Sequence, residues 1–148
     1  MRKKMVMNTD RNLETLKITL EIDDRRSQGA PAIDIVLGIN RISSEHHFHI
    51  FPGRNTIKFS EAITHRGEQC LIMDIKQKDS RPLTGMITMT DLKIHGVSVG
   101  TYLYNCTYHP TEDGDGVPGG IVLNNHGRWL WPFHAPISEN AGMKVGLW

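Results

Sequence analysis

Residues 123–137 read LNNHGRWLWPFHAPI, and residues 92–110 read LKIHGVSVGTYLYNCTYHP. Together these two stretches contain two of the three tryptophans and all three tyrosines of the chain. In both of them apolar and polar residues alternate and aromatic residues are frequent, which is typical of β-strands with one buried face. The two stretches therefore favour an all-β fold.

The same period of two runs through the rest of the chain. Residues 16–22, 32–40, 45–51, 69–77 and 86–95 alternate in this way or are continuously apolar, with Gly, Pro, Asn or Asp between them. Many short strands with turn signals near every ten residues predict an antiparallel β-sandwich or jelly roll, here of about 8–10 strands. Short helical turns are predicted only at residues 60–64 and 137–144. The Asn- and Gly-containing residues 124–127 predict a hairpin turn.

The length of 148 residues is that of one domain with its own core. We expect an N-terminal arm at residues 1–14, the β-sandwich at residues 15–137 and a C-terminal tail at residues 138–148. The tail is apolar for a chain end, which favours docking on this domain or on a neighbouring subunit.

Composition and charge argue against several classes of partner. Seventeen basic and sixteen acidic residues leave a formal charge of +1, without the basic excess of a nucleic-acid-binding protein. No run approaches the ~18 apolar residues of a membrane span, and no apolar segment follows the basic start as in a signal peptide. Cys70 and Cys106 are consistent either with a disulfide or with two buried free thiols.

The chain is rich in histidine, with eight residues. His47 and His49 are two positions apart on a predicted strand, so their rings share a face about 7 Å apart, a geometry that suits two ligands of one metal ion. Gly53 and Arg54 occupy the positions where a cupin-type site needs a Glu. An exposed or interface strand is the favoured interpretation, and a pH-responsive interface is another. A metal-dependent jelly-roll enzyme built on His47 and His49 is the weakest of the three interpretations.

Asp113 and Asp115 resemble the start of a calcium loop. The later oxygen ligands of such a loop are missing, so a surface turn is favoured and no cofactor is expected. Calcium bound with help from another loop is the alternative. The sequence also lacks GxSxG, GxxxxGK[ST] and HExxH. We therefore do not expect an enzyme.

The aromatic residues allow two main interpretations. Trp129, Trp131 and Phe133 share one side of a strand if Pro132 introduces no bulge. An exposed face would form a stacking platform for a glycan from Tyr104, Tyr108, Trp129 and Trp131, with Asn125 as a hydrogen-bonding neighbour. A buried face would be the core between two sheets, which is the favoured interpretation, and an apolar subunit interface is the third.

The C-terminal third resembles small β-sandwich proteins of tailed bacteriophages, which look like carbohydrate-binding modules. The matching residues are Leu92, Ile94, Gly96, Val97, Tyr108, Pro110, Leu123, Asn125, Gly127, Trp129, Trp131, Phe133, Pro136 and Ile137. The resemblance implies a non-enzymatic virion component on a jelly-roll scaffold: a capsid decoration, neck, tail or baseplate protein, assembled in the host cytoplasm. The implied partners are other virion subunits, in a homo-oligomer or on a capsid or tail scaffold. A glycan-binding module is the alternative that it implies.

Overall fold

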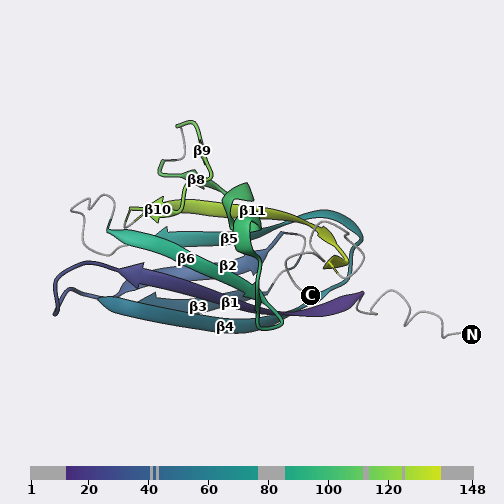
Figure 1. Cartoon of the computed structure of the whole chain (residues 1–148), viewed down its shortest axis with the longest axis horizontal. Helices are drawn as coiled ribbons and strands as arrows, with labels where there is room; N and C mark the ends of the chain where they lie inside the picture. The colour runs from purple at the N-terminus through teal and green to yellow at the C-terminus, as the bar shows by residue number, and fades with distance from the viewer. Residues whose placement is uncertain are drawn as a thin grey trace, which may run out of the picture.

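Two antiparallel sheets packed face to face make up this protein (Figure 1). The computed structural model describes residues 13–40, 42, 44–76, 86–111, 114–124 and 126–137. These residues contain eleven strands and one 3₁₀ helix, and three of the strands are only two residues long. The predicted all-β sandwich is confirmed, with slightly more strands than expected.

Each sheet combines strands from distant parts of the sequence. The five-stranded sheet has the order β10 (Val122–Leu123), β6 (Ile87–Ile94), β1 (Glu14–Asp24) and β4 (Gly53–Ile63), with β7 (Val97–Ser98) also paired to β6. The six-stranded sheet has the order β3 (Glu45–Ile50), β2 (Ile33–Ile39), β5 (Gly67–Lys76), β11 (Gly127–Ala135), β8 (Thr107–His109) and β9 (Val117–Pro118). The helix η2 (Gly100–Asn105) lies between β7 and β8 in the chain.

The core lies between the sheets and follows from the alternation. In β1 and β2 every second side chain is buried, and Leu20 and Ile35 are completely inaccessible to solvent. Full burial of one such side chain stabilises the fold by about 1.5–3 kcal/mol. β6 has a bulge at Thr90: Met89 pairs with Ile22 and Asp91 pairs with the adjacent Glu21, so Thr90 has no paired residue in β1. The extra residue allows Met89 and Leu92 both to point into the core.

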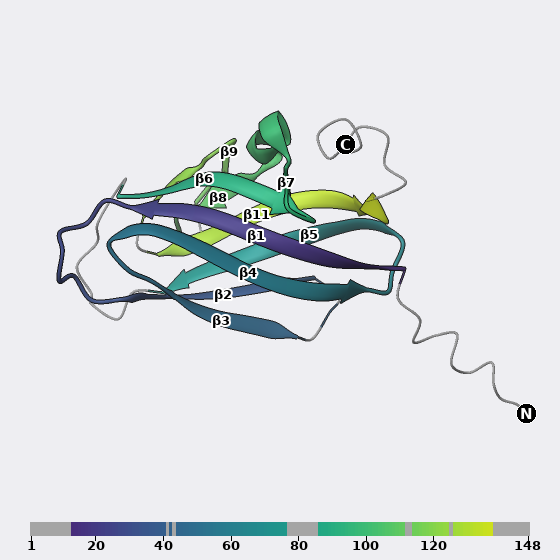
Figure 2. The ribbon, with the colours of Figure 1, turned by 60° about the horizontal axis from the view of Figure 1, so that its bottom comes forward.

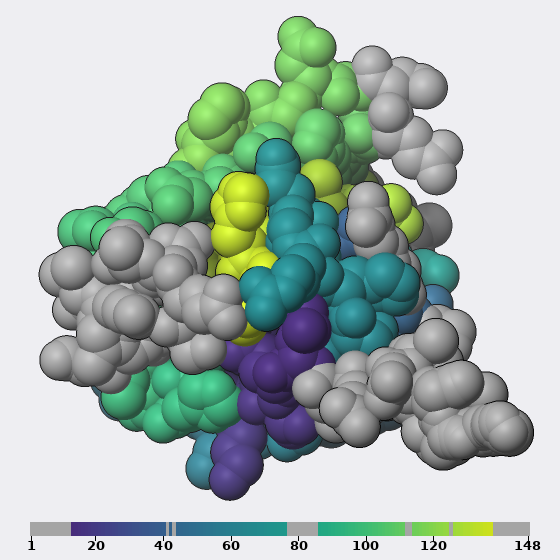
Figure 3. Space-filling view, turned by 90° about the vertical axis from the view of Figure 1, so that its right-hand side faces the viewer, coloured from purple at the N-terminus to yellow at the C-terminus, as the bar shows by residue number. Residues whose placement is uncertain are grey.

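The predicted ends of the domain meet at one end of the sandwich. Figure 3 shows the start of β1 (purple) beside the connection from β4 to β5 (teal) and the end of β11 (yellow). The Leu13 amide donates to the Ile63 carbonyl at 2.6 Å, and the Ile137 amide donates to Glu14 Oε2 at 2.5 Å. β1 thus begins at Glu14, inside the predicted arm; residues 1–12 of that arm and the tail at 138–148 lie outside the described residues.

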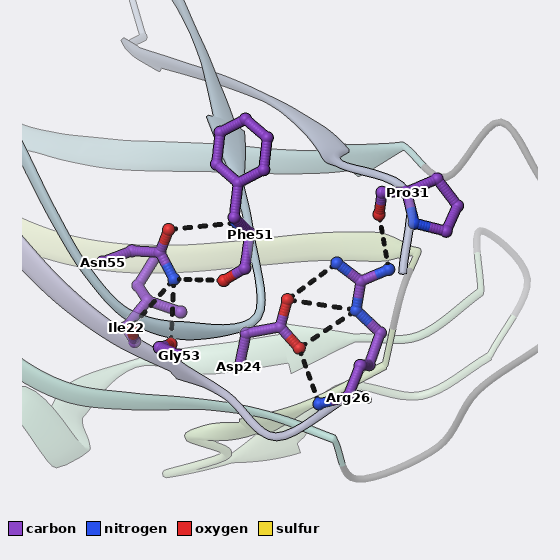
Figure 4. A network of polar contacts seen from close by, with 7 residues as sticks. All are labelled: Ile22, Asp24, Arg26, Pro31, Phe51, Gly53 and Asn55. Carbon is purple, nitrogen blue, oxygen red and sulfur yellow. Dashed lines mark hydrogen bonds and ion pairs between the residues drawn. The ribbon is translucent and has the colours of Figure 1, made fainter. Parts of the chain in front are cut away.

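A buried ion pair closes the opposite end. The Asp24 carboxylate accepts hydrogen bonds from the Arg26 amide (3.0 Å), Nε (3.0 Å) and Nη2 (2.7 Å). The Arg26 Nη1 donates to the Pro31 carbonyl at 2.7 Å (Figure 4). Both side chains are almost fully buried, so these bonds fix the chain reversal that leads from one sheet to the other.

Three local predictions are wrong. Residues 60–63 are not helical but continue β4, because Phe59, Glu61 and Ile63 maintain the period of two. Residues 124–127 do not form a hairpin: the strand before them, β10, pairs with β6, whereas β11 pairs with β5 and β8 in the other sheet. Tyr102 and Tyr104, expected on a strand, lie in η2. The predicted helix at 137–144 is described only at Ile137.

Candidate functional site

The aromatic platform predicted from the sequence is inside the core. Trp129 is 0% exposed, Trp131 1% and Tyr108 3%, so these rings cannot stack on a glycan at the surface. The glycan platform is therefore wrong for these three residues and the core interpretation is right, because β11 directs its odd-numbered side chains between the sheets. Tyr104 alone is exposed, on η2, and Asn125 lies outside the described residues.

The buried aromatic residues position neighbouring loops. The Trp131 indole Nε1 donates to the Tyr102 carbonyl in η2 at 2.8 Å. The Tyr108 hydroxyl donates to the His126 carbonyl and accepts from the Asn124 amide, the latter at 3.0 Å. The aromatic motif thus attaches η2 and the turn before β11 to the core.

His47 and His49 share the outer face of β3, as predicted, but they lie beside different carboxylates. His49 Nδ1 is 2.7 Å from Asp34 Oδ1, and His47 Nε2 is 3.8 Å from Glu45 Oε1. Across the described part of the chain, no three His, Cys, Asp or Glu side chains are grouped so that they could hold a metal ion. Asp115 is exposed, and Asp113 lies outside the described residues.

Both cysteines are free thiols. Cys106 is buried, whereas Cys70 is half-buried on the outer face of the six-stranded sheet, more accessible than expected. Burial raises the pKa of both thiols, although a contact with the Trp129 indole opposes the shift at Cys106. A raised thiol pKa lowers the thiolate population, so neither is an activated nucleophile.

A hollow of about 660 Å³ opens on the outer face of the six-stranded sheet, beside β8 and the start of β11. Its lining includes Lys76, His109 and His126, together with an exposed ion pair in which Arg128 Nε is 2.7 Å from Asp74 Oδ1. The hollow is open to solvent, and apolar residues such as Ile75, Pro110 and Leu130 line it together with the charged ones. No helix in the described ranges is long and apolar enough to cross a membrane.

The candidate site is the side of the sandwich formed by β3 and β4, which we call the open side. β3 is an edge of the six-stranded sheet and β4 is an edge of the five-stranded sheet. The two strands are consecutive and connected only by Phe51 and Pro52, so both edges lie on the same side (Figures 1 and 2). In the part of the chain that the structure describes, each strand pairs on one side only.

Polar and aromatic contacts join the two edges from within. His46 Nε2 lies 2.9 Å from Glu61 Oε1, and Glu61 is only 7% exposed. The His46 ring is also 4.7 Å from the Phe59 ring, and Phe48 is 6.3 Å from Phe59. These contacts hold β3 and β4 at a fixed separation. The role of Glu61 was missed because residues 60–64 were predicted to be helical.

The outward-facing residues of the open side differ between the two strands. β3 presents Glu45, His47 and His49, whereas β4 presents Arg54, Thr56, Lys58 and Ser60. Phe51, directly after β3, is 54% exposed. Its backbone is fixed by Asn55, whose Oδ1 accepts from the Phe51 amide at 3.0 Å and whose Nδ2 donates to the Phe51 carbonyl at 2.8 Å (Figure 4).

Comparison with known proteins gives no assignment: the chain matches no protein-family model, no curated protein and no solved structure.

Proposed function

We propose that the protein is a non-enzymatic structural subunit of a tailed-phage particle and that it functions through contacts with neighbouring subunits. The observation that carries this proposal is the open side, where both sheets end in strands with no second partner among the described residues. An unpaired strand edge presents a row of backbone donors and acceptors to another chain. The open side thus offers a neighbouring subunit a surface to which it could bind.

Two further observations support the proposal. The aromatic residues of the phage-like motif pack in the core and hold loops in place, which agrees with a motif that specifies a scaffold. The inter-edge contacts of His46 with Glu61 and Phe59 keep both edges in a defined position, so a neighbouring subunit would meet a preformed surface.

A protein inventory of purified phage particles tests this function. Particles from cells that carry the gene are separated on a density gradient, and their proteins are quantified by mass spectrometry. We expect peptides of this chain at a fixed stoichiometry to the major capsid or tail proteins in the particle fractions. The proposal is refuted if the chain is expressed but remains in the soluble fractions of the gradient.

A further inference from the structure

We infer that β3 is a self-association surface, on which the β3 edge of a second copy of this chain pairs antiparallel about a two-fold axis through His47. The inference deepens the proposed function and rests on its premise that the protein acts through subunit contacts. It depends on how the edge strands differ, on the order of charges along β3 and on the position of Phe51.

Among the long sheet edges of the described residues, β3 has the fewest features that prevent an edge from pairing. Natural proteins protect edges with short strands, prolines and charged residues, lysine in particular. In the described ranges β10 and β9 are two residues long, and β9 contains Pro118. The long edge β4 presents Arg54 and Lys58. β3 has six residues without Pro, Lys or Arg, and its one outward-facing carboxylate is Glu45, so it is the least protected edge among these.

The register of such a pair is limited by the alternation of outward- and inward-facing residues along β3. A two-fold axis perpendicular to a sheet places outward-facing residues opposite outward-facing residues, so it must pass through a residue and not between two residues. An axis through Phe48 would place His47 opposite His49 of the second copy, and Glu45 opposite the Phe51 position. An axis through His47 places Glu45 opposite His49 of the second copy, at both ends of the paired segment.

Only an axis through His47 or Phe48 keeps five of the six β3 residues paired, and of these two charge complementarity selects the axis through His47. Directly opposite residues on one face of an antiparallel pair have Cβ atoms about 4.5–5.5 Å apart, within reach for a carboxylate and an imidazole. His49 already lies 2.7 Å from Asp34 Oδ1 of its own chain. In the pair, the His49 ring would lie between Asp34 of its own chain and Glu45 of the second copy. His46 and Phe48, which point toward the interior, would lie opposite each other.

The exposed Phe51 extends the same contact. Its ring centroid is 6.3 Å from that of His49, and the Asn55 bonds hold the backbone that presents it. A large aromatic residue beside an unpaired edge is the type of side chain that dominates subunit contacts. The pairing would join the six-stranded sheets of two copies into one continuous sheet.

Sedimentation velocity of the full chain over a concentration series tests this inference. We expect the unmodified protein to form a dimer. The His47→Lys variant places two lysines opposite each other on the axis, and we expect it to raise the dimer dissociation constant by about ten-fold or more. The matched control is Thr56→Lys, which adds the same charge to an exposed position on the β4 edge and should leave the dimer unchanged.

A mixing experiment tests the register itself. The His47→Lys and His47→Glu proteins should each be weakened alone, and their equimolar mixture should recover dimers, because only an axis through residue 47 brings the two new charges together. Circular dichroism and the urea midpoint of each protein verify that the fold is retained.

The inference is overturned if the unmodified protein remains monomeric at its solubility limit, if His47→Lys leaves an oligomer intact, or if mixing restores nothing. These outcomes are separate from the proposed function. A chain that is present in particles but monomeric in solution would retain the function and refute β3 pairing. A dimer that responds to these substitutions as expected but is absent from particles would support β3 pairing and refute the proposed function.

Discussion

Replacing Arg26 by Met provides a direct test of the energetics of this fold. The side chains of Asp24 and Arg26 are 0% and 2% exposed. Arg26 Nε and Nη2 both donate to the Asp24 carboxylate, and Nη1 donates to the Pro31 carbonyl. Methionine approximates the length of the aliphatic stem but leaves the Asp24 carboxylate buried without its counterion.

Breaking a buried ion pair by removing one partner costs about 3–5 kcal/mol, because the remaining charge is desolvated and uncompensated. Domains of this type have total stabilities of about 5–15 kcal/mol. Arg26→Met should therefore remove a large part of the free energy of unfolding and lower the Tm by roughly 10–15 °C, at about 3 °C per kcal/mol. The assay is urea unfolding followed by tryptophan fluorescence, in which the midpoint should fall and the m-value should remain constant.

Arg128→Met is the matched control, since Arg128 makes a similar two-bond contact with the Asp74 carboxylate at 2.7 and 3.1 Å but is 55% exposed. An exposed pair contributes about 0–1 kcal/mol. The double variant Asp24→Asn/Arg26→Met, which also removes the unpaired charge, should recover part of the loss. Equal losses for Arg26→Met and Arg128→Met would refute the assignment of the energy to burial.

Three further predictions concern the aromatic motif and its surroundings. Tyr108→Phe removes the hydroxyl that binds the turn before β11 and should cost about 1–3 kcal/mol in urea unfolding; an unchanged midpoint would contradict this. Burial raises the pKa of Cys106 above 9.0 and that of Tyr108 above 10.0. As the pH rises through these values, the unfolded chain loses the two protons while the folded protein keeps them, so the free energy of unfolding should fall. Cys106→Ala should reduce the fall that begins near pH 9, and an identical pH profile would show that this thiol contributes nothing. Gly127→Ala should destabilise the fold far more than Gly53→Ala: both glycines have positive φ, but a Cβ at Gly127 would lie 2.6 Å from the His109 carbonyl, whereas one at Gly53 meets nothing within 4 Å. Similar melting temperatures for the two glycine variants would argue against this close approach.

The sequence was a good guide wherever a strand has one buried and one exposed face. Residues 16–22 predict β1 because the hydrophobic effect alone selects which alternate residues are buried. Even the bulge in β6 is visible as a change of phase, since the buried residues Met89 and Leu92 are three positions apart. Residues 60–63 were wrongly predicted to be helical, because the residue that continues their period of two is a charged one, Glu61. Its burial depends on the contact with His46 on another strand.

Partners across space were not predictable in the same way. The turn at residues 124–127 has the composition of a hairpin, but Leu123 pairs with Ile87 while Trp129 lies opposite Met73 in the other sheet. Turn chemistry specifies local backbone geometry, and which sheet each flanking strand joins depends on the packing of the whole core. The contact of His46 with Glu61 depends in the same way on the position of two sheet edges.

The sequence by itself thus determined that Trp129 and Trp131 share one side of a strand, because alternation along an extended backbone is a local property. Only the tertiary structure decided that this side is the interior, since burial depends on a second sheet that covers the face. The same division applies at β3. Alternation placed His47 and His49 on one face. Among the described residues β3 pairs with β2 alone, and this tertiary arrangement makes it the edge on which the inferred pairing depends.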